Sequence, residues 1–430
     1  MKRRCAIGKR RVMQMKKRLL CFTMLLTVTI SAITFTNNVK AATKWNTSKS
    51  VTKEENGIKY SAYLTEDGKE SWIYQIKLSK KITKLTLPKE INQAKLTRVG
   101  FGKELYNKGE DEDAYQNLFG DTIEPWHNCY GDLSNDDKNK QTIETVAIPA
   151  TVNQLEIATF SGMKKLKSVV IPEQTASVPA YTFAKCSALS KVTFSKNMNE
   201  IDSTAFVKSN QVKTFSCPKA NKTFAVKKGM LTTRSGKTLV LVPNKMKKLT
   251  IPSSVKEIKA NALNGSQATS IVIPKSVKKI GAKALESKKI TKVSLSSKNK
   301  TYKMANNCIY RKSNGTLTAV LVKTKKITIP SKVKVIDDTV SVMGKIGTKN
   351  QVHIPKSVKK VVEDWMFFGD SAIVYFHGTK PPVIVSKFKG NEFTALPIFN
   401  KVYVPKKAKK TYIKWAKDRD GLKWNNLHTF

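Results

Sequence analysis

The chain has 430 residues, of which 40% are hydrophobic and 26% are charged. A chain of this length and hydrophobic content is large and apolar enough to build a sizeable core, and it has room for several domains. The formal net charge of +48 at pH 7 is extreme. Nucleic acid is the usual partner of so basic a chain.

The first 41 residues have the pattern of an export signal. Residues 1–18 carry nine Lys or Arg and no acid, and the apolar run Leu19 to Phe35 follows. Val39-Lys40-Ala41 places small residues where a signal peptidase cleaves, so we predict a signal peptide over 1–41 with cleavage before Ala42. An uncleaved membrane anchor is the alternative, and 17 apolar residues are at the short limit for a span. Met13 or Met15 is an alternative initiator.

Export changes which polyanions the chain would meet. Ten basic residues and no acid lie in residues 1–41, so the remainder keeps a charge of +38, mostly as lysine. Cell-wall phosphate polymers, anionic membrane and sulfated glycans are the candidate partners, all of them bound by salt-sensitive attraction. The alternative is a charged surface that only keeps the protein soluble. We expect no transmembrane span after cleavage and no specific nucleic acid.

Residues 42–142 are expected to form an N-terminal cap. Residues 42–55 are polar and are expected to be a flexible lead-in. Two strand-rich segments at 57–64 and 71–78 then flank a turn and predict a β-hairpin. Residues 103–141 form an acidic insertion that holds ten of the 31 acids. Clustered carboxylates suit calcium, but the insertion has no Asp-x-Asp-x-Asp-Gly loop, and an exposed acidic loop needs no metal.

A hydrophobic motif recurs through residues 143–385. Val-x-Ile alternation predicts a short strand with one face inward, and the proline that often follows ends the strand. A later Ala-x-x-Phe or Ala-Phe pair supplies apolar side chains to the core from the side opposite the strand. Such a unit cannot bury its own face, so copies must stack. The copies end at Ile148, Ile171, Phe194, Cys217, Ile251, Ile273, Leu295, Ile329 and Ile354, with degenerate copies at Phe376 and Val404.

Most copies recur at a spacing of 22 to 25, but the steps from Cys217 to Ile251 and from Leu295 to Ile329 are enlarged to 34. These enlarged units are one design used twice, because Asn221-Lys-Thr-Phe224 recurs at an offset of 78 as Asn299-Lys-Thr-Tyr302. Each unit contains a predicted hairpin tip that projects from the array, at 234–237 and at 312–315.

Residues 386–430 are expected to form a C-terminal cap. Val402 to Val404 predicts a last strand, and 406–417 predicts a helix with Ala408, Tyr412 and Trp415 on one side. Packing that side on the last repeat would cap the array. A basic helix that lies on a membrane surface is the alternative.

These features together resemble the BspA-like leucine-rich-repeat family of bacterial surface proteins. The resemblance rests on Val-x-Ile-Pro at a spacing of 22 or 23, the opening Gly57-Ile-Lys-Tyr60 and the ending Tyr403-Val-Pro405-Lys…Tyr412-x-x-Trp415. It implies a right-handed leucine-rich-repeat solenoid with a strand per repeat and an irregular convex side, displayed outside the cell for adhesion or binding. It implies no enzyme and fixes no ligand. The asparagine ladder of ordinary leucine-rich repeats, three positions past the strand, is missing.

Four cysteines lie beyond residue 41, at spacings of 57, 31 and 91, which resemble no metal or disulfide framework. Cys186 and Cys217 are interpreted as small buried hydrophobic residues.

The candidate ligand-binding residues lie in columns that repetition would build on the strand face and at its turns. The residue before Val-x-Ile is often basic, and the middle residue is small or hydroxylated until it becomes His353 and then Tyr375. The alternative is that Thr stands there only because it favours strands. Lysines in the turns predict a positive ridge, or else a solvated edge that blocks strand addition. The candidates are Lys191, Lys248, Lys292, Lys326, Lys278, Lys279, Lys359, Lys360, His353 and Tyr375.

No catalytic, metal or cofactor motif is present, and of the four histidines neither His353 nor His377 has a Ser, Cys or carboxylate partner fixed by spacing. We therefore expect a secreted, non-enzymatic protein of the bacterial surface. Its partners would be anionic cell-wall polymers, glycans or host surface proteins. A wall-associated hydrolase and a structural surface-layer component are the alternatives.

Overall fold

The computed structural model describes residues 43–101, 115–116, 122–123, 139–347, 349–362, 372–385, 401–417 and 427–430. The chain divides into two compact units, Met1–Lys44 and Trp45–Phe430, and the second contains all of the described strands and helices. The predicted signal peptide and nearly all of the acidic insertion, where calcium was considered, lie outside the described residues.

The predicted N-terminal hairpin is present and has a third strand. Strands β2 (Ile58–Thr65) and β3 (Glu70–Leu78) pair antiparallel, and β1 (Trp45–Glu55) pairs antiparallel with β2. The expectation of a flexible lead-in over 42–55 was therefore wrong. Pairing satisfies the β1 backbone, and Trp45 anchors its start by packing edge-on to Trp72 at 5.7 Å. Strand β6 (Ala94–Val99) then pairs parallel with β3 and starts the stack.

One strand per repeat forms a first row of parallel strands, as predicted. Its register aligns Thr145, Ser168, Lys191 and Thr214, one from each of four successive rungs, a rung being one turn of the solenoid. The row consists of β4 (Lys84–Thr86), β9 (Thr145–Ala147), β11 (Ser168–Val170), β13 (Lys191–Thr193) and β15 (Thr214–Ser216); then β19 (Lys248–Thr250), β21 (Ser270–Ile273) and β23 (Lys292–Leu295); then β27 (Lys326–Thr328), β30 (Gln351–Ile354), β32 (Ile373–Phe376), β34 (Lys401–Val404) and β35 (Leu427–Thr429).

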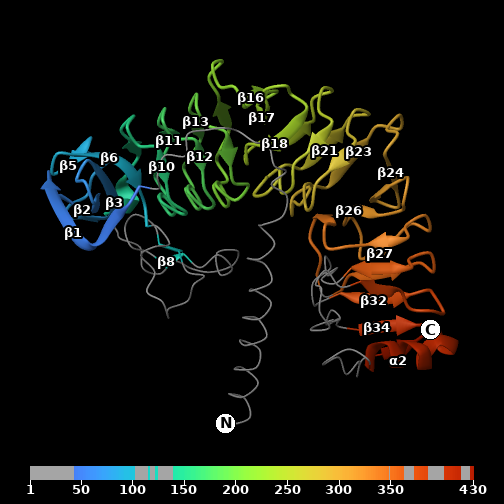
Figure 1. The fold of residues 1–430 in the computed structure, drawn as a ribbon. Helices are drawn as coiled ribbons and strands as arrows, with labels where there is room; N and C mark the ends of the chain where they lie inside the picture. The colour runs from blue at the N-terminus through green and yellow to red at the C-terminus, as the bar shows by residue number, and fades with distance from the viewer. Residues whose placement is uncertain are drawn as a thin grey trace, which may run out of the picture. The chain divides into compact units, whose positions relative to one another are not determined.

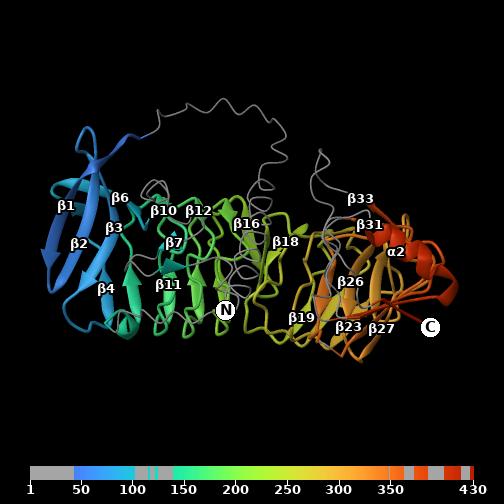
Figure 2. The same ribbon diagram turned by 90° about the horizontal axis from the view of Figure 1, so that it is seen from below.

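A second row of shorter strands lies where only irregular structure was expected. Six of the eight strands form where a polar residue is followed by a buried aliphatic one, whereas β28 and β33 begin with a valine. Figure 2 shows the first row (β4, β11, β19, β27) along one side and the second row (β10, β12, β31, β33) along the other. This row comprises β10 (Gln154–Leu155), β12 (Ser177–Val178), β14 (Glu200–Ile201), β20 (Glu257–Ile258), β22 (Lys279–Ile280), β28 (Val335–Ile336), β31 (Lys360–Val362) and β33 (Val383–Val385).

The enlarged units each add three antiparallel strands. The first has β16 (Phe224–Lys227), β17 (Met230–Thr233) and β18 (Thr238–Leu241), and the second has β24 (Tyr302–Ala305), β25 (Cys308–Arg311) and β26 (Leu317–Leu321). Their tips were predicted to project, but each is tied to the following rung. Ser254 Oγ donates to the carbonyl of Gly236 at 3.0 Å, and the amide of Lys334 donates to the carbonyl of Gly315 at 2.9 Å.

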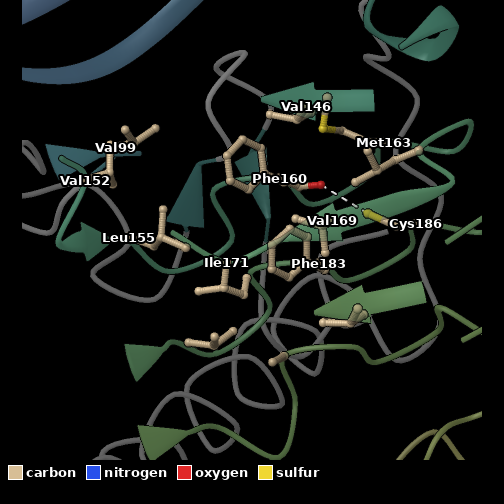
Figure 3. Close-up of a cluster of buried hydrophobic side chains, with 14 of the residues drawn as sticks. Val99, Val146, Val152, Leu155, Phe160, Met163, Val169, Ile171, Phe183 and Cys186 are labelled. Carbon is tan, nitrogen blue, oxygen red and sulfur yellow. Dashed lines mark hydrogen bonds between the residues drawn. The ribbon is translucent and has the colours of Figure 1, made fainter. Parts of the chain in front are cut away.

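The core between the two rows is built from one aromatic or aliphatic layer per rung. Phe160, Phe183 and Phe206 occupy the same position in three successive repeats, and they stack with ring centroids 5.5 and 5.6 Å apart. Figure 3 shows Phe160 and Phe183 side by side, with Cys186 donating to the carbonyl of Phe160 at 3.2 Å. Cys186 is fully buried, as interpreted from the sequence, and burial raises its pKa to about 12. Cys217 is half-buried against the same core.

The chain ends in a short helical cap. A 3₁₀ turn (Lys406–Ala408) leads into α2 (Lys409–Lys417), slightly later than the predicted start (Figure 1). Ala408 and Tyr412 are buried, and the Tyr412 hydroxyl donates to the carbonyl of Gly378 at 3.2 Å. The apolar side of the helix therefore covers the last rungs. Within the described residues, no helix has the length and apolar character needed to cross a bilayer.

Candidate binding surface

The outward residues of the first row form straight lines because the strands pair in register. At the C-terminal end, successive partners are Thr328, His353, Tyr375, Tyr403 and His428, from β27, β30, β32, β34 and β35. Figure 1 shows β27, β32 and β34 in this order toward the C-terminus, with β30 between the first two. Side chains of successive strands at one position are neighbours in a parallel sheet, so the line becomes a continuous surface feature.

Four of these residues stack as rings, and we call His353, Tyr375, Tyr403 and His428 the aromatic column. The ring centroids are 4.4 Å apart for His353 and Tyr375, 4.5 Å for Tyr375 and Tyr403, and 5.0 Å for Tyr403 and His428. The first two pairs are parallel to within 5° and 9°. Because each ring covers the face of the next, the column offers ring edges and polar atoms to a ligand, with open faces only at its ends.

His377 and Phe430 flank the aromatic column. His377 Nε2 lies 2.9 Å from His353 Nδ1, and the His377 ring packs edge-on to Phe430 at 5.2 Å. Phe430 is 51% exposed, one of four large hydrophobic residues exposed in the described part of the chain. An apolar ring thus lies in the open beside polar ring edges. Tyrosine, which combines an apolar ring with a polar hydroxyl, is enriched at interfaces.

The histidine pair is held neutral by its surroundings. Burial, then the Lys326 charge, then His377 lower the pKa of His353 to about 4. Burial and Lys326 also lower the pKa of His377. A single proton can bridge the two facing nitrogens, and the other nitrogen of His353, Nε2, is buried without a hydrogen-bond partner in the described part of the chain.

The four candidate lysines of the first row do not form one column. Lys248 and Lys292 share a sheet with Ser270 between them, whereas Lys191 lies in the preceding sheet between Ser168 and Thr214. Lys326 belongs to the last sheet, where it is the partner of Gln351 and lies close enough to both histidines to lower the pKa of each.

The predicted ridge of turn lysines is divided. The amide of Lys278 donates to the carbonyl of Lys256 at 2.7 Å, and the amide of Lys359 donates to the carbonyl of Lys334 at 2.9 Å. The candidate pairs 278–279 and 359–360 therefore belong to separate stacks of rungs. Lys279 forms an ion pair with Glu257 at 2.8 Å, which offsets its charge. Lys360 pairs in register with Val335 and Val383.

Sequence reasoning did not place His377, His428 and Phe430 at this surface. Residues 427–429 read Leu-His-Thr, which lacks the proline and the Val-x-Ile form of the other copies, although Leu427 does occupy the inward position. The alternation of an inward and an outward residue was the feature that these residues still shared with the other copies. Within the described ranges, no three His, Cys, Asp or Glu residues lie together as a metal site would require.

Short parallel strands, one per repeat and stacked around an aliphatic core, define a leucine-rich-repeat solenoid. The model of the BspA-type leucine-rich-repeat region matches six copies, over residues 138–228 and 243–373, which is just over half of the chain. The chain belongs to this BspA-type leucine-rich-repeat family.

Solved structures of bacterial proteins are similar at low identity. A leucine-rich cell surface protein of Faecalibacterium prausnitzii is 14% identical, with 81% of this chain and 98% of that one covered and a TM-score of 0.35. The pneumococcal vaccine antigen PcpA is 13% identical, with 88% and 98% covered and a TM-score of 0.36. A leucine-rich-repeat protein of Eubacterium ventriosum is 14% identical, with 83% and 94% covered and a TM-score of 0.35. No curated protein matches the chain.

Proposed function

We propose that this protein is exported to the bacterial surface and acts there as a non-enzymatic binding protein. Its ligands would be anionic cell-wall polymers, glycans or host surface proteins. The observation that carries the proposal is the aromatic column with its exposed neighbour Phe430, on the regular face of a strongly basic solenoid. Family membership and the export signal predicted over residues 1–41 support the same role.

The contacts of His353 favour binding over hydrolysis. A catalytic histidine needs a nucleophile or a substrate proton within hydrogen-bond reach and a group that orients it. His353 instead stacks on Tyr375, faces His377, and has its pKa lowered to about 4. At neutral pH it is a neutral ring at a surface.

The proposal is tested by retention on three immobilised ligands: isolated cell wall, a sulfated glycan and a host surface protein. We expect retention on at least one polyanion at low salt and release as salt rises, because screening weakens exposed charge pairs. Replacing Lys278, Lys279, Lys359 and Lys360 by Glu should weaken it. Retention that is indifferent to salt and to this charge reversal would contradict the anionic partner. Release of fragments from labelled peptidoglycan would contradict the non-enzymatic role.

A further inference from the structure

A basic cleft lies between the tip of the second enlarged unit and the rung that follows it, outside the aromatic column. Its volume is about 320 Å³. Four of its eight lining residues are lysines and none is acidic. The lining consists of Lys303, Tyr310, Lys312, Ser313, Asn314, Gly315, Lys332 and Lys334.

Backbone contacts fix the shape of this cleft. Gly315 has a φ of +69°, and a Cβ there would lie 2.6 Å from the carbonyl oxygen of Lys332, so only glycine allows so close an approach. The Lys334 amide donates to the Gly315 carbonyl at 2.9 Å, which joins the tip to the next rung. Lys312 Nζ donates to the carbonyl of Asn299 at 2.6 Å, so one ammonium group is already positioned.

The first enlarged unit is an internal control, because it has the same design earlier in the chain. Ala225 stands where the second unit has Lys303, and Ser254 stands where it has Lys332. The scaffold therefore forms without either lysine. Arg234, the counterpart of Lys312, donates both Nε and Nη2 to backbone carbonyls of its own unit. The scaffold common to both units therefore does not require the two extra lysines of the second unit.

The cleft carries positive charge that no acidic residue of its lining balances, which favours an anion. None of the four lysines forms an ion pair within the described residues, and like charges gathered in one cleft repel. Lysine binds phosphate-type oxyanions as a compact point charge, and Ser313 and Asn314 add neutral donors. We infer that this cleft binds one oxyanion group, a phosphodiester or a sulfate ester, of an anionic polymer. The inference rests on the proposed surface-binding function and assigns it a defined anion site.

The test is a calorimetric titration with a poly(glycerol phosphate) oligomer and, separately, with a heparin-derived oligosaccharide. The variant Lys303→Ala/Lys332→Ser gives the second unit the residues of the first. The control Lys81→Ala/Lys213→Ser removes two other exposed lysines. We expect wild type and control to bind one of the two oligomers with equal affinity, which identifies the source of the oxyanion. The cleft variant should bind about tenfold more weakly or worse.

Two outcomes would overturn the inference: equal affinity of the cleft variant and the control, or no saturable binding of either oligomer by wild type. Because Ala225 and Ser254 occur naturally in the first unit, the variant should fold, and the single change Lys303→Ala gives the same comparison in milder form. If the cleft variant and the control bind the oligomer equally while wild type is still retained on one of the three immobilised ligands, the cleft inference fails and the proposed function stands. If wild type is retained on none of the three, the proposed function fails by itself.

Discussion

At the scale of single residues, His353 makes the stability of the last rungs depend on pH. The unfolded chain binds a proton there near pH 6.5, whereas the folded chain does so only near pH 4. Between these values the unfolded state binds more protons, so the free energy of unfolding should fall as the pH drops from 6.5 to 4. His377, whose pKa is also lowered, adds to the same slope.

Replacing His353 by Phe keeps a ring in the aromatic column and removes this titration. We expect a shallower loss of stability between pH 6.5 and 4, measured by urea denaturation at successive pH values. Tyr375→Phe retains both histidines and should follow wild type. Parallel curves for wild type and His353→Phe would show that the neutral pair has no part in folding.

Two buried asparagines, Asn221 and Asn299, stabilise the enlarged units. The Nδ2 of Asn221 donates to the carbonyls of Ser195 and Met198 at 2.9 and 2.8 Å, and its Oδ1 accepts from the amides of Thr223 and Phe224. Asn299 repeats the pattern toward the preceding rung. In these two units the position four past the strand marker, rather than three, carries the turn hydrogen bonds of a side-chain amide.

Asn221→Val should therefore be costly even though valine occupies the same position in other rungs. It leaves several buried backbone groups unpaired, and we expect a loss of about 3 kcal/mol or more in the free energy of unfolding. The matched control is Thr175→Val, which removes one hydrogen bond to the carbonyl of Val152 and should cost about 1 kcal/mol. Equal losses in urea denaturation would contradict this role for Asn221.

At the scale of elements, the turns of the repeat include a left-handed position that glycine does not always fill. Gly162, Lys185 and Lys208 occupy this position in three successive repeats, with φ of 80°, 57° and 62°. A side chain in this region costs about 1–2 kcal/mol, while glycine costs about 0.5–1 kcal/mol in chain entropy. Lys185→Gly should therefore raise the free energy of unfolding by about 0.5 kcal/mol.

The control for this prediction is Lys191→Gly, an equally basic position in the extended strand β13. It should lower stability, because glycine gains nothing in extended backbone and costs entropy. A thermal melt that falls for both variants would contradict the claim that the left-handed turn is strained in Lys185.

The sequence predicted the first-row strands well because Val-x-Ile alternation and the proline after it are strong local signals. It missed β1, whose polar residues look like a linker, since backbone pairing with β2 does not depend on apolar side chains. Two-residue strands such as β10 and β12 are too short to leave an alternation pattern. The tips of the enlarged units were located, but the docking of the second depends on the close approach of Gly315 to the following rung.

At the scale of the whole solenoid, repetition turns single outward positions into lines. The part of the line that contains His353 and Tyr375 could be predicted, because the strand markers fix the register. The division of the lysines could not, because the enlarged units interrupt both rows and separate repeats that are similar in sequence. The His353–His377 contact also depends on a residue just past its strand, whose side-chain direction alternation does not determine.

The central claim is that the chain binds its ligand through the exposed face of the first row, at the aromatic column. The most direct measurement compares wild type with His353→Thr/Tyr375→Thr/Tyr403→Thr for retention on the ligand that wild type binds. Threonine occupies the same position in other rungs, as Thr193, Thr250 and Thr328. Val170→Thr, on the same face but far along the row, serves as the control.

We predict that the triple variant remains folded by circular dichroism and loses about tenfold or more in affinity, because a few central aromatic residues carry most of the binding energy in protein interfaces. Val170→Thr should bind like wild type. Retention of the folded triple variant at the wild-type level would contradict the claim.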